Sequence, residues 1–135
     1  MHLPELDAKF HYEFWRPVTA IQEGDRDGNR RTRADAAWQP LAVTPNFPEY
    51  PSGHACATAA VAHTIEAFID GPVVIPARNV VTGEERFYRH AGVVVDEVVE
   101  ARMLLGPHFR FSDEDGAEIG QRIARQIRRR FFKAR

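Results

Sequence analysis

Pro51-Ser52-Gly53-His54 stands where a proline-rich loop meets a segment rich in alanine, and the rest of the chain can be placed around this tetrapeptide. Closely spaced prolines in residues 38–50 resist both helix and central strand. Residues 55–69 are rich in small side chains and carry apolar residues at helical spacing, which predicts a helix. Ser52 is therefore expected at or beside the N-cap of that helix.

The start of this helix has the chemistry of an anion-binding site. A helix N-terminus presents unpaired N–H groups and the positive end of the helix dipole, which together can hold an oxyanion. Gly53 lets the backbone approach such a ligand closely, and His54 places a titratable imidazole beside it. Taken alone, however, the tetrapeptide favours a simpler interpretation, an ordinary capped helix with an incidental histidine.

Length and composition indicate one ordinary globular domain spanning residues 1–135. The sequence is 44% apolar and has a formal net charge of −1, which excludes a disordered chain and gives no reason to expect binding to nucleic acid. The single cysteine, Cys56, excludes an internal disulfide framework and is predicted to be a small buried residue. The sequence contains no apolar run of membrane-spanning length and no signal peptide pattern, so it predicts a soluble chain and indicates no compartment.

The remaining pattern predicts a mostly helical protein. Residues 1–7 form a polar lead, and Pro17 suits the first turn of a short helix over 18–23. Residues 73–75 and 79–81 are two short segments rich in β-branched side chains, and they predict a small hairpin or an extended excursion. Two longer helices are expected over about 87–105 and from a cap at 112, 113 or 115 to about 132. Three sets of apolar residues at helical spacing mark the three long helices: Val61, Ile65, Phe68 and Ile69; Val94, Val98 and Ala101; and Ile119, Ile123, Ile127 and Phe131.

Charged residues outside the tetrapeptide share its chemical theme. Lys9 and Arg16 lie seven residues apart, and Arg102 precedes His108 by six residues. Two guanidinium groups and an ammonium group suit a multiply charged tetrahedral oxyanion, because charge-assisted hydrogen bonds are strong and directional. Two histidines allow one to bond the central atom while the other moves protons. Each cation alone would be interpreted as a surface or ion-paired residue, so the prediction depends on their combination.

These motifs resemble the three-part signature of the vanadium-dependent haloperoxidases and type 2 phosphatidic acid phosphatases. The three blocks are Lys9, six residues and Arg16-Pro17; Pro51-Ser52-Gly53-His54; and Arg102, five residues and His108. Residues 14–21, 47–54 and 106–111 resemble the haloperoxidase branch in particular. The resemblance extends from about Lys9 to the last helix, and it implies an all-α helical bundle with the anion held between helices.

The resemblance also implies a role for each motif residue. Lys9, Arg16 and Arg102 would bind the equatorial oxygens of vanadate or phosphate, helped by the Ser52 hydroxyl and the Gly53 N–H. His108 would be the axial ligand of vanadium, or the nucleophile that forms a phosphohistidine in a phosphatase. His54 would be the general acid–base near the opposite apical oxygen, and Phe47 would lie near the halide site.

Three functions follow from this resemblance. The leading one is vanadate-dependent oxidation of halide by hydrogen peroxide. The second is hydrolysis of a phosphate ester by an enzyme of the acid phosphatase type, with His108 as nucleophile and no vanadium. The third is an inactive or partial fragment that keeps the signature without a complete pocket.

The sequence departs from the family pattern in three places. Ala101 replaces a serine, and Ser112 stands where an aspartate often orients the axial histidine, with Asp113 one residue late. Relatives usually carry several helices before the Lys9 block, whereas this chain begins a few residues upstream. The expectation is a truncated domain that exposes Phe10, Phe14 and Trp15. A homo-oligomer, or a second chain that supplies the missing helices, would cover them.

Overall fold

The computed structural model describes residues 4–79 and 82–131. Its elements follow in the order α1 (Pro4–Tyr12), α2 (Pro17–Gln22), a 3-10 turn η1 (Gly24–Arg26), α3 (Gly53–Phe68), β1 (Ile75–Arg78), β2 (Glu85–Tyr88), α4 (Ala91–Leu105) and α5 (Arg110–Arg130). The prediction of a helical bundle with a small hairpin is confirmed. Among the described residues, no helix is both long enough and apolar enough to cross a membrane.

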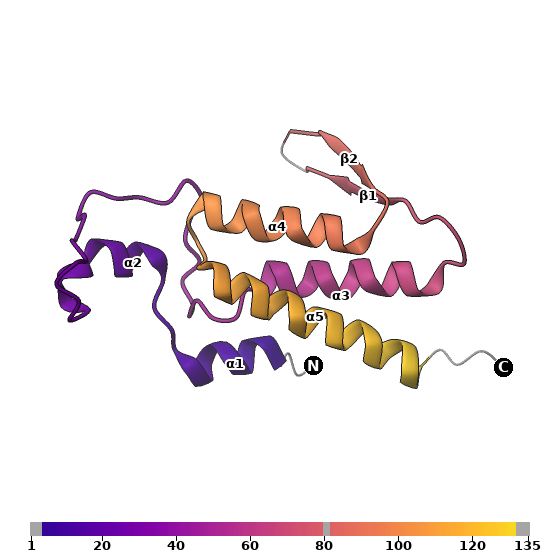
Figure 1. Cartoon of the computed structure of the whole chain (residues 1–135), viewed down its shortest axis with the longest axis horizontal. Coiled ribbons are helices and arrows are strands. Elements are labelled where there is room, and N and C mark those ends of the chain that lie inside the picture. The colour runs from indigo at the N-terminus through magenta and orange to yellow at the C-terminus, as the bar shows by residue number, and fades with distance from the viewer. Residues whose placement is uncertain (1–3, 80–81, 132–135) are drawn as a thin grey trace.

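Three long helices build the body of the molecule. α3, α4 and α5 lie side by side, with α4 running opposite to the other two (Figure 1). As a result, the start of α3, the end of α4 and the start of α5 meet at one end of the bundle (Figure 1). Segments that are far apart in the sequence, at 52–54, 102–108 and 110–113, are thereby brought to the same place.

The contact between α3 and α5 depends on small residues. The buried positions of α5 are Ser112, Asp113, Gly116, Gly120 and Ala124, and those of α3 are Ala55, Cys56, Ala59 and Ala62. A Cβ atom at Gly116 would overlap the carbonyl oxygen of Ser52, and one at Gly120 would overlap that of Cys56. The two backbones therefore pack closely enough to fix the start of α3 against α5. A hydrogen bond of 3.0 Å from the Ser52 N–H to the Ser112 carbonyl oxygen ties the two helix starts together.

The apolar residues predicted to face the core on the three long helices are partly wrong. Val61 and Phe68 are exposed on α3, and Phe131 is 73% exposed at the end of α5. The α5 isoleucines are only half-buried, because the face of α5 toward α3 is lined by glycine and alanine instead. On α4, Val94 is buried as predicted, but Val95 and Val99 take the other buried positions and Ala101 is exposed.

The hairpin lies later in the chain than predicted. β1 and β2 pair antiparallel, with Ile75 opposite Tyr88, so residues 85–88 form a strand and α4 begins at Ala91 rather than near 87. Val80 and Val81, placed in the hairpin by the sequence, lie outside the described residues. The hairpin completes a small hydrophobic core of Ala62, Val73, Ile75, Tyr88, Ala91 and Val94.

Two helix starts also differ from the prediction. Residues 4–12 form α1, although residues 1–7 were expected to be a polar lead. α5 begins at Arg110 with Phe109 at the N-cap and no side-chain cap, so none of the three expected capping residues is used. By contrast, Ser52 caps α3 as predicted, through a long contact of 3.5 Å from the Ala55 N–H to Ser52 Oγ. Cys56 is buried, also as predicted.

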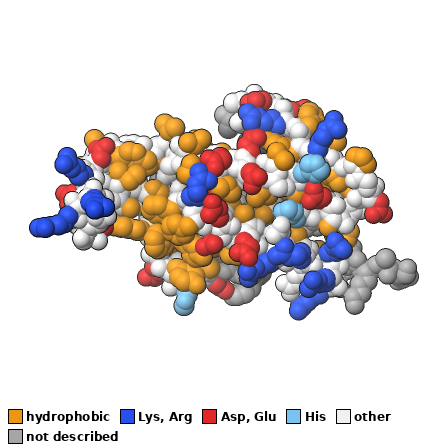
Figure 2. Space-filling view, viewed as in Figure 1, with side chains coloured by type: hydrophobic (Ala, Val, Ile, Leu, Met, Phe, Trp, Pro, Cys, Tyr) orange, Lys and Arg blue, Asp and Glu red, His pale blue; other side chains and the backbone are white. Residues whose placement is uncertain are grey.

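The aromatic residues after Lys9 are exposed, as the sequence predicted. Phe10 is 60% exposed, Phe14 37% and Trp15 39%. Figure 2 shows apolar side chains gathered on this side of the molecule, beside α1 and the start of α5. Phe14 packs edge-on against Phe109 and Phe111, which joins the segment after α1 to the start of α5.

Candidate active site

A pocket of about 300 Å³ opens where the helix ends meet. It is lined by Lys9, Pro45, Phe47, Gly53, His54, Ala57 and His108. Four of the seven residues predicted to form the site therefore share one pocket, although they come from α1, the start of α3 and the connection between α4 and α5. The other three, Arg16, Ser52 and Arg102, are not among its lining residues.

Lys9 is almost fully buried, with 1% of its surface exposed. Its ammonium group donates to the carbonyl oxygens of Glu49 at 2.9 Å, Pro51 at 2.5 Å and Pro48 at 3.4 Å. The ammonium nitrogen also lies 5.3 Å from the centre of the Phe47 ring, within the range of a cation–π contact. Lys9 therefore holds the proline-rich loop in addition to lining the pocket, a role that the sequence analysis did not predict.

Arg16 connects the same loop to the other end of the site. Its guanidinium donates to the Phe47 carbonyl oxygen from Nε at 3.1 Å and from Nη2 at 3.0 Å, and to the Pro107 carbonyl oxygen from Nη1 at 2.9 Å. Arg16 Nη1 also lies 3.4 Å from Nε2 of His108. Burial lowers the pKa of Arg16, and the Glu49 carboxylate opposes this effect. Because arginine stays protonated in proteins, Arg16 places a fixed positive charge beside His108.

His108 is buried and is held by a residue that the sequence analysis did not identify. Its Nδ1 lies 2.6 Å from Oε1 of Glu49, and Glu49 has no exposed surface. The same oxygen accepts the Phe109 N–H at 3.2 Å. Neither Ser112 nor Asp113 takes this position. The sequence feature that could have indicated this role is that Glu49 is a single carboxylate in a loop of prolines and aromatics, three residues before Ser52.

Asp113 instead lies behind the site at the start of α5. It is fully buried, and burial raises the pKa of its carboxyl group. The Ser52 side chain, His108 and Arg102 each act to lower it. Asp113 therefore interacts electrostatically with Ser52, His108 and Arg102. The hydrogen-bond partner of His108 Nδ1, however, is Glu49.

His54 occupies the first turn of α3 and faces the pocket. Burial lowers the pKa of His54, and electrostatic interactions with Arg102, His108 and Lys9 act in the same direction. The imidazole is therefore neutral at pH 7 and able to accept a proton. Its position agrees with the predicted acid–base role, which stays a prediction.

Arg102, near the end of α4, is half-buried and belongs to the same charged environment. It lowers the pKa values of His54 and Arg16, which places its guanidinium near both. Its Nε is buried and has no hydrogen-bond partner among the residues that the structure describes. A buried donor without a partner is costly, so Arg102 is a group that a bound anion would stabilise.

The donor set fits vanadate or phosphate. Three cations, the N-terminus of a 16-residue helix and a neutral histidine converge on one end of the bundle. Among the described residues, no group of three or more His, Cys, Asp or Glu side chains is placed to hold a metal cation. Cationic side chains and helix N-terminal N–H groups are donors of the kind that an oxyanion requires.

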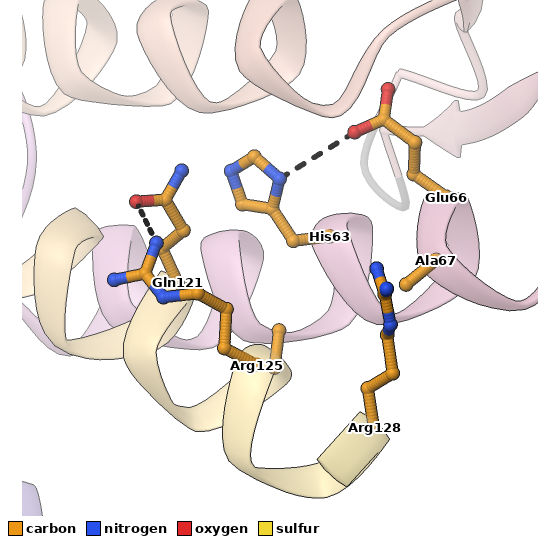
Figure 3. Close-up of a pocket in the computed structure, with 7 residues that line it drawn as sticks. His63, Glu66, Ala67, Gln121, Arg125 and Arg128 are labelled. Carbon is orange, nitrogen blue, oxygen red and sulfur yellow. Dashed lines mark hydrogen bonds and ion pairs between the residues drawn. The ribbon is translucent and has the colours of Figure 1, made fainter. Parts of the chain in front are cut away.

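A second pocket, of about 350 Å³, lies farther along the bundle between α3 and α5 (Figure 3). His63 and Glu66 of α3 point toward one another there, with His63 Nδ1 3.6 Å from a Glu66 oxygen. On the α5 side, Arg125 donates to Gln121 at 2.8 Å. None of the predicted site residues lines this pocket, so it supplies matched control positions for experiments on the site.

Comparison with known proteins agrees with the architecture. Residues 3–134 match the family described as the VCPO second helical-bundle domain. The chain belongs to the vanadium haloperoxidase family. A vanadium chloroperoxidase from Curvularia inaequalis is 33% identical to this haloperoxidase-family chain over 75 residues, which cover 48% of this chain and 12% of that protein.

Solved structures of vanadium haloperoxidases share the fold of this family member. The structure described as the first bacterial vanadium-dependent iodoperoxidase superposes with a TM-score of 0.78 at 24% identity, and covers 93% of this chain and 29% of the iodoperoxidase chain. An apo-type bacterial vanadium-dependent chloroperoxidase gives a TM-score of 0.62 at 20% identity, and covers 90% of this chain and 32% of its own. This chain therefore spans less than a third of these relatives.

Lys9 offers a test of the observed geometry. Replacing it by methionine keeps most of the volume but removes the ammonium donor from the carbonyl oxygens of Glu49 and Pro51, whereas the Pro48 carbonyl oxygen still accepts from Arg16 Nη2 at 3.3 Å. Because an unsatisfied buried polar group costs about 1–3 kcal/mol, the free energy of unfolding in urea is expected to fall by about 3 kcal/mol. Arg26→Met is the control, since Arg26 pairs with Glu23 on the surface and should change stability by less than about 0.5 kcal/mol. A Lys9→Met protein as stable as wild type would contradict the bonding described here.

Proposed function

We propose that this chain carries the vanadate site of a haloperoxidase that oxidises halide with hydrogen peroxide. The observation that carries the proposal is the convergence of Lys9, Gly53, His54 and His108 on one pocket, with the Arg16 guanidinium in contact with His108. Belonging to the haloperoxidase family supports the proposal, and the relatives described above are named as vanadium-dependent enzymes.

Each residue would contribute a separate part of the site. His108 Nε2 would supply the bond to vanadium. Lys9, Arg16 and Arg102 would neutralise the charge of the anion's oxygens, and the Ser52 hydroxyl and Gly53 N–H would hydrogen-bond to them. Lys9 would do so by sharing hydrogen bonds that it now gives to the loop carbonyls. His54, neutral at pH 7, would act as the proton acceptor of the pocket.

Bound vanadate would supply the centre at which hydrogen peroxide is activated to oxidise the halide. The chain's own contribution is to bind the anion and fix its position. Phe47 lies over both Lys9 and Arg16, with its ring centre 5.3 Å from Lys9 Nζ and from the Arg16 guanidinium carbon. The ring thereby places an apolar wall beside the cations, where a halide ion would approach.

Ligand-induced stabilisation tests whether the site assembles in this chain. A ligand that binds only the folded state, at 100 times its dissociation constant, stabilises it by roughly 2.7 kcal/mol. Orthovanadate and phosphate are each expected to raise the melting temperature. His63→Ala, which removes a histidine of the second pocket, should leave both shifts unchanged, whereas Arg102→Ala should reduce them.

Activity assays distinguish the haloperoxidase, the phosphatase and the inactive fragment. We expect halide oxidation that requires added vanadate and is inhibited by phosphate. Phosphate ester hydrolysis that vanadate blocks would instead assign the phosphatase reaction. The absence of any thermal shift with either anion would contradict the proposal and support a partial fragment without a working site.

A further inference from the structure

We propose that Glu49 is the positioning residue of His108, holding its imidazole in the tautomer that carries hydrogen on Nδ1 and leaves Nε2 directed at the anion site. The inference rests on the proposed function for its consequence, but the contact itself is a feature of the chain. Nδ1 of His108 lies 2.6 Å from Glu49 Oε1, and the two side chains are 3% and 0% exposed. Water therefore does not compete for this hydrogen bond.

Two neighbours with opposite hydrogen-bonding roles select the same tautomer. The Glu49 carboxylate lies against Nδ1 and, when ionised, only accepts hydrogen bonds, so Nδ1 must carry the hydrogen. The Arg16 guanidinium lies 3.4 Å from Nε2 and only donates, so Nε2 must present its lone pair. In the other tautomer, a lone pair would face the carboxylate and an N–H would face the guanidinium.

The Glu49 carboxylate is itself held in place. Its Oε1 accepts the N–H of Phe109, the residue directly after His108, at 3.2 Å. One oxygen thus binds both the imidazole and the backbone that carries it. At the other end, the Glu49 carbonyl oxygen accepts from Lys9 at 2.9 Å. The side chain and the backbone of Glu49 are therefore both fixed, which limits rotation of the His108 ring.

A different role for Glu49 would be to balance the buried positive charges. The hydrogen bonds of Arg16 go to backbone carbonyl oxygens and to His108 rather than to the carboxylate. Orienting His108 and balancing charge make different predictions for the Glu49→Gln variant. Glu49→Gln removes the charge but keeps a side-chain oxygen between the two donors, whereas Glu49→Leu removes both charge and acceptor. Turning the amide around would place its NH₂ against the Phe109 N–H, so the oxygen is expected to stay in place.

The tautomer of His108 is the direct readout. In the ¹⁵N NMR spectrum of the wild-type chain without any anion, His108 is expected to show a protonated Nδ1 and an unprotonated Nε2. The His108 signals can be assigned by their loss in His108→Gln. Glu49→Gln should keep this pattern, and Glu49→Leu should give a mixture of tautomers or the reverse pattern. A cooperative thermal melt checks that each variant is folded.

Orthovanadate binding, measured by calorimetry, reports the consequence for the site, because His108 Nε2 would bond vanadium there. Loss of a residue that orients a metal-ligating histidine typically weakens metal binding by 10–100-fold, so this loss is expected for Glu49→Leu. Glu49→Gln should stay within a few-fold of wild type. Glu49→Asp, which withdraws the carboxylate by one methylene, should fall between them and replaces Glu49→Leu if that variant does not fold.

Three results would overturn the proposal. They are a wild-type His108 protonated on Nε2, an unchanged tautomer in Glu49→Leu, or a loss of binding in Glu49→Gln as large as in Glu49→Leu, which would indicate a charge-balancing role. If the wild-type chain binds neither phosphate nor vanadate, the proposed function fails. The tautomer measurement still decides the role of Glu49, because it is made without ligand.

Discussion

Replacing Gly120 by alanine is expected to lower the free energy of unfolding by about 3 kcal/mol. The added Cβ would overlap the Cys56 carbonyl oxygen and lie 2.8 Å from both Ala59 Cβ and Ala60 N. These atoms belong to α3 backbone or to a side chain that cannot rotate away, so the helices must move apart. Overpacking in a core costs typically 1–3 kcal/mol, and a clash with backbone lies at the upper end. Alanine's higher helix propensity returns only about 1 kcal/mol.

Gly92→Ala supplies the matched control. Gly92 is also inside a helix, near the start of α4, but a Cβ there would meet no atom within 4 Å. The same chemical change is therefore expected to leave stability unchanged or raise it by about 0.5–1 kcal/mol. Urea denaturation of both variants separates the effect of helix contact from that of helix propensity. Equal stability of Gly120→Ala and Gly92→Ala would contradict the close contact between α3 and α5.

This contact also explains why one part of the fold was predictable and another was not. Proline and glycine positions predicted some element boundaries, because these residues restrict the backbone locally: α2 begins at Pro17, and α4 ends before Gly106, whose φ is 88°. The buried faces were harder, because hydrophobic periodicity assumes that the largest apolar side chains are buried. Where two backbones approach closely, Gly116 and Gly120 occupy the contact and the isoleucines are left at its edges.

The site was predictable to a similar degree. Its charged residues were found because their spacing matches a family signature, and Lys9, Gly53, His54 and His108 do meet. The contact between Glu49 and His108 joins residues 59 apart in the sequence, so no local pattern could indicate it. The hydrogen bonds from Lys9 and Arg16 to loop carbonyls were missed for the same reason. These hydrogen bonds show that Lys9 and Arg16 also fix the proline-rich loop beside the pocket.

Replacing His108 by alanine is expected to abolish halide oxidation and to weaken binding of orthovanadate, because it removes the ring nitrogen that lies 3.4 Å from Arg16 Nη1. The substitution should also destabilise the chain. It leaves the Glu49 carboxylate, which has no exposed surface, without its imidazole partner. Leaving a buried polar group without its hydrogen-bond partner costs about 1–3 kcal/mol and more for a charged group, so a loss of about 3 kcal/mol in the free energy of unfolding is expected.

Loss of activity through chemistry must be separated from loss through unfolding, and His54→Ala provides the comparison. His54 is partly exposed, and its removal leaves the Glu49–His108 contact intact. His54→Ala should therefore keep the wild-type urea midpoint and still lose turnover, whereas His108→Ala should lose both. The double change Glu49→Gln with His108→Ala should recover part of the stability, because it removes the buried charge, but none of the activity. Full turnover in His108→Ala, measured below its urea transition, would remove His108 from the site.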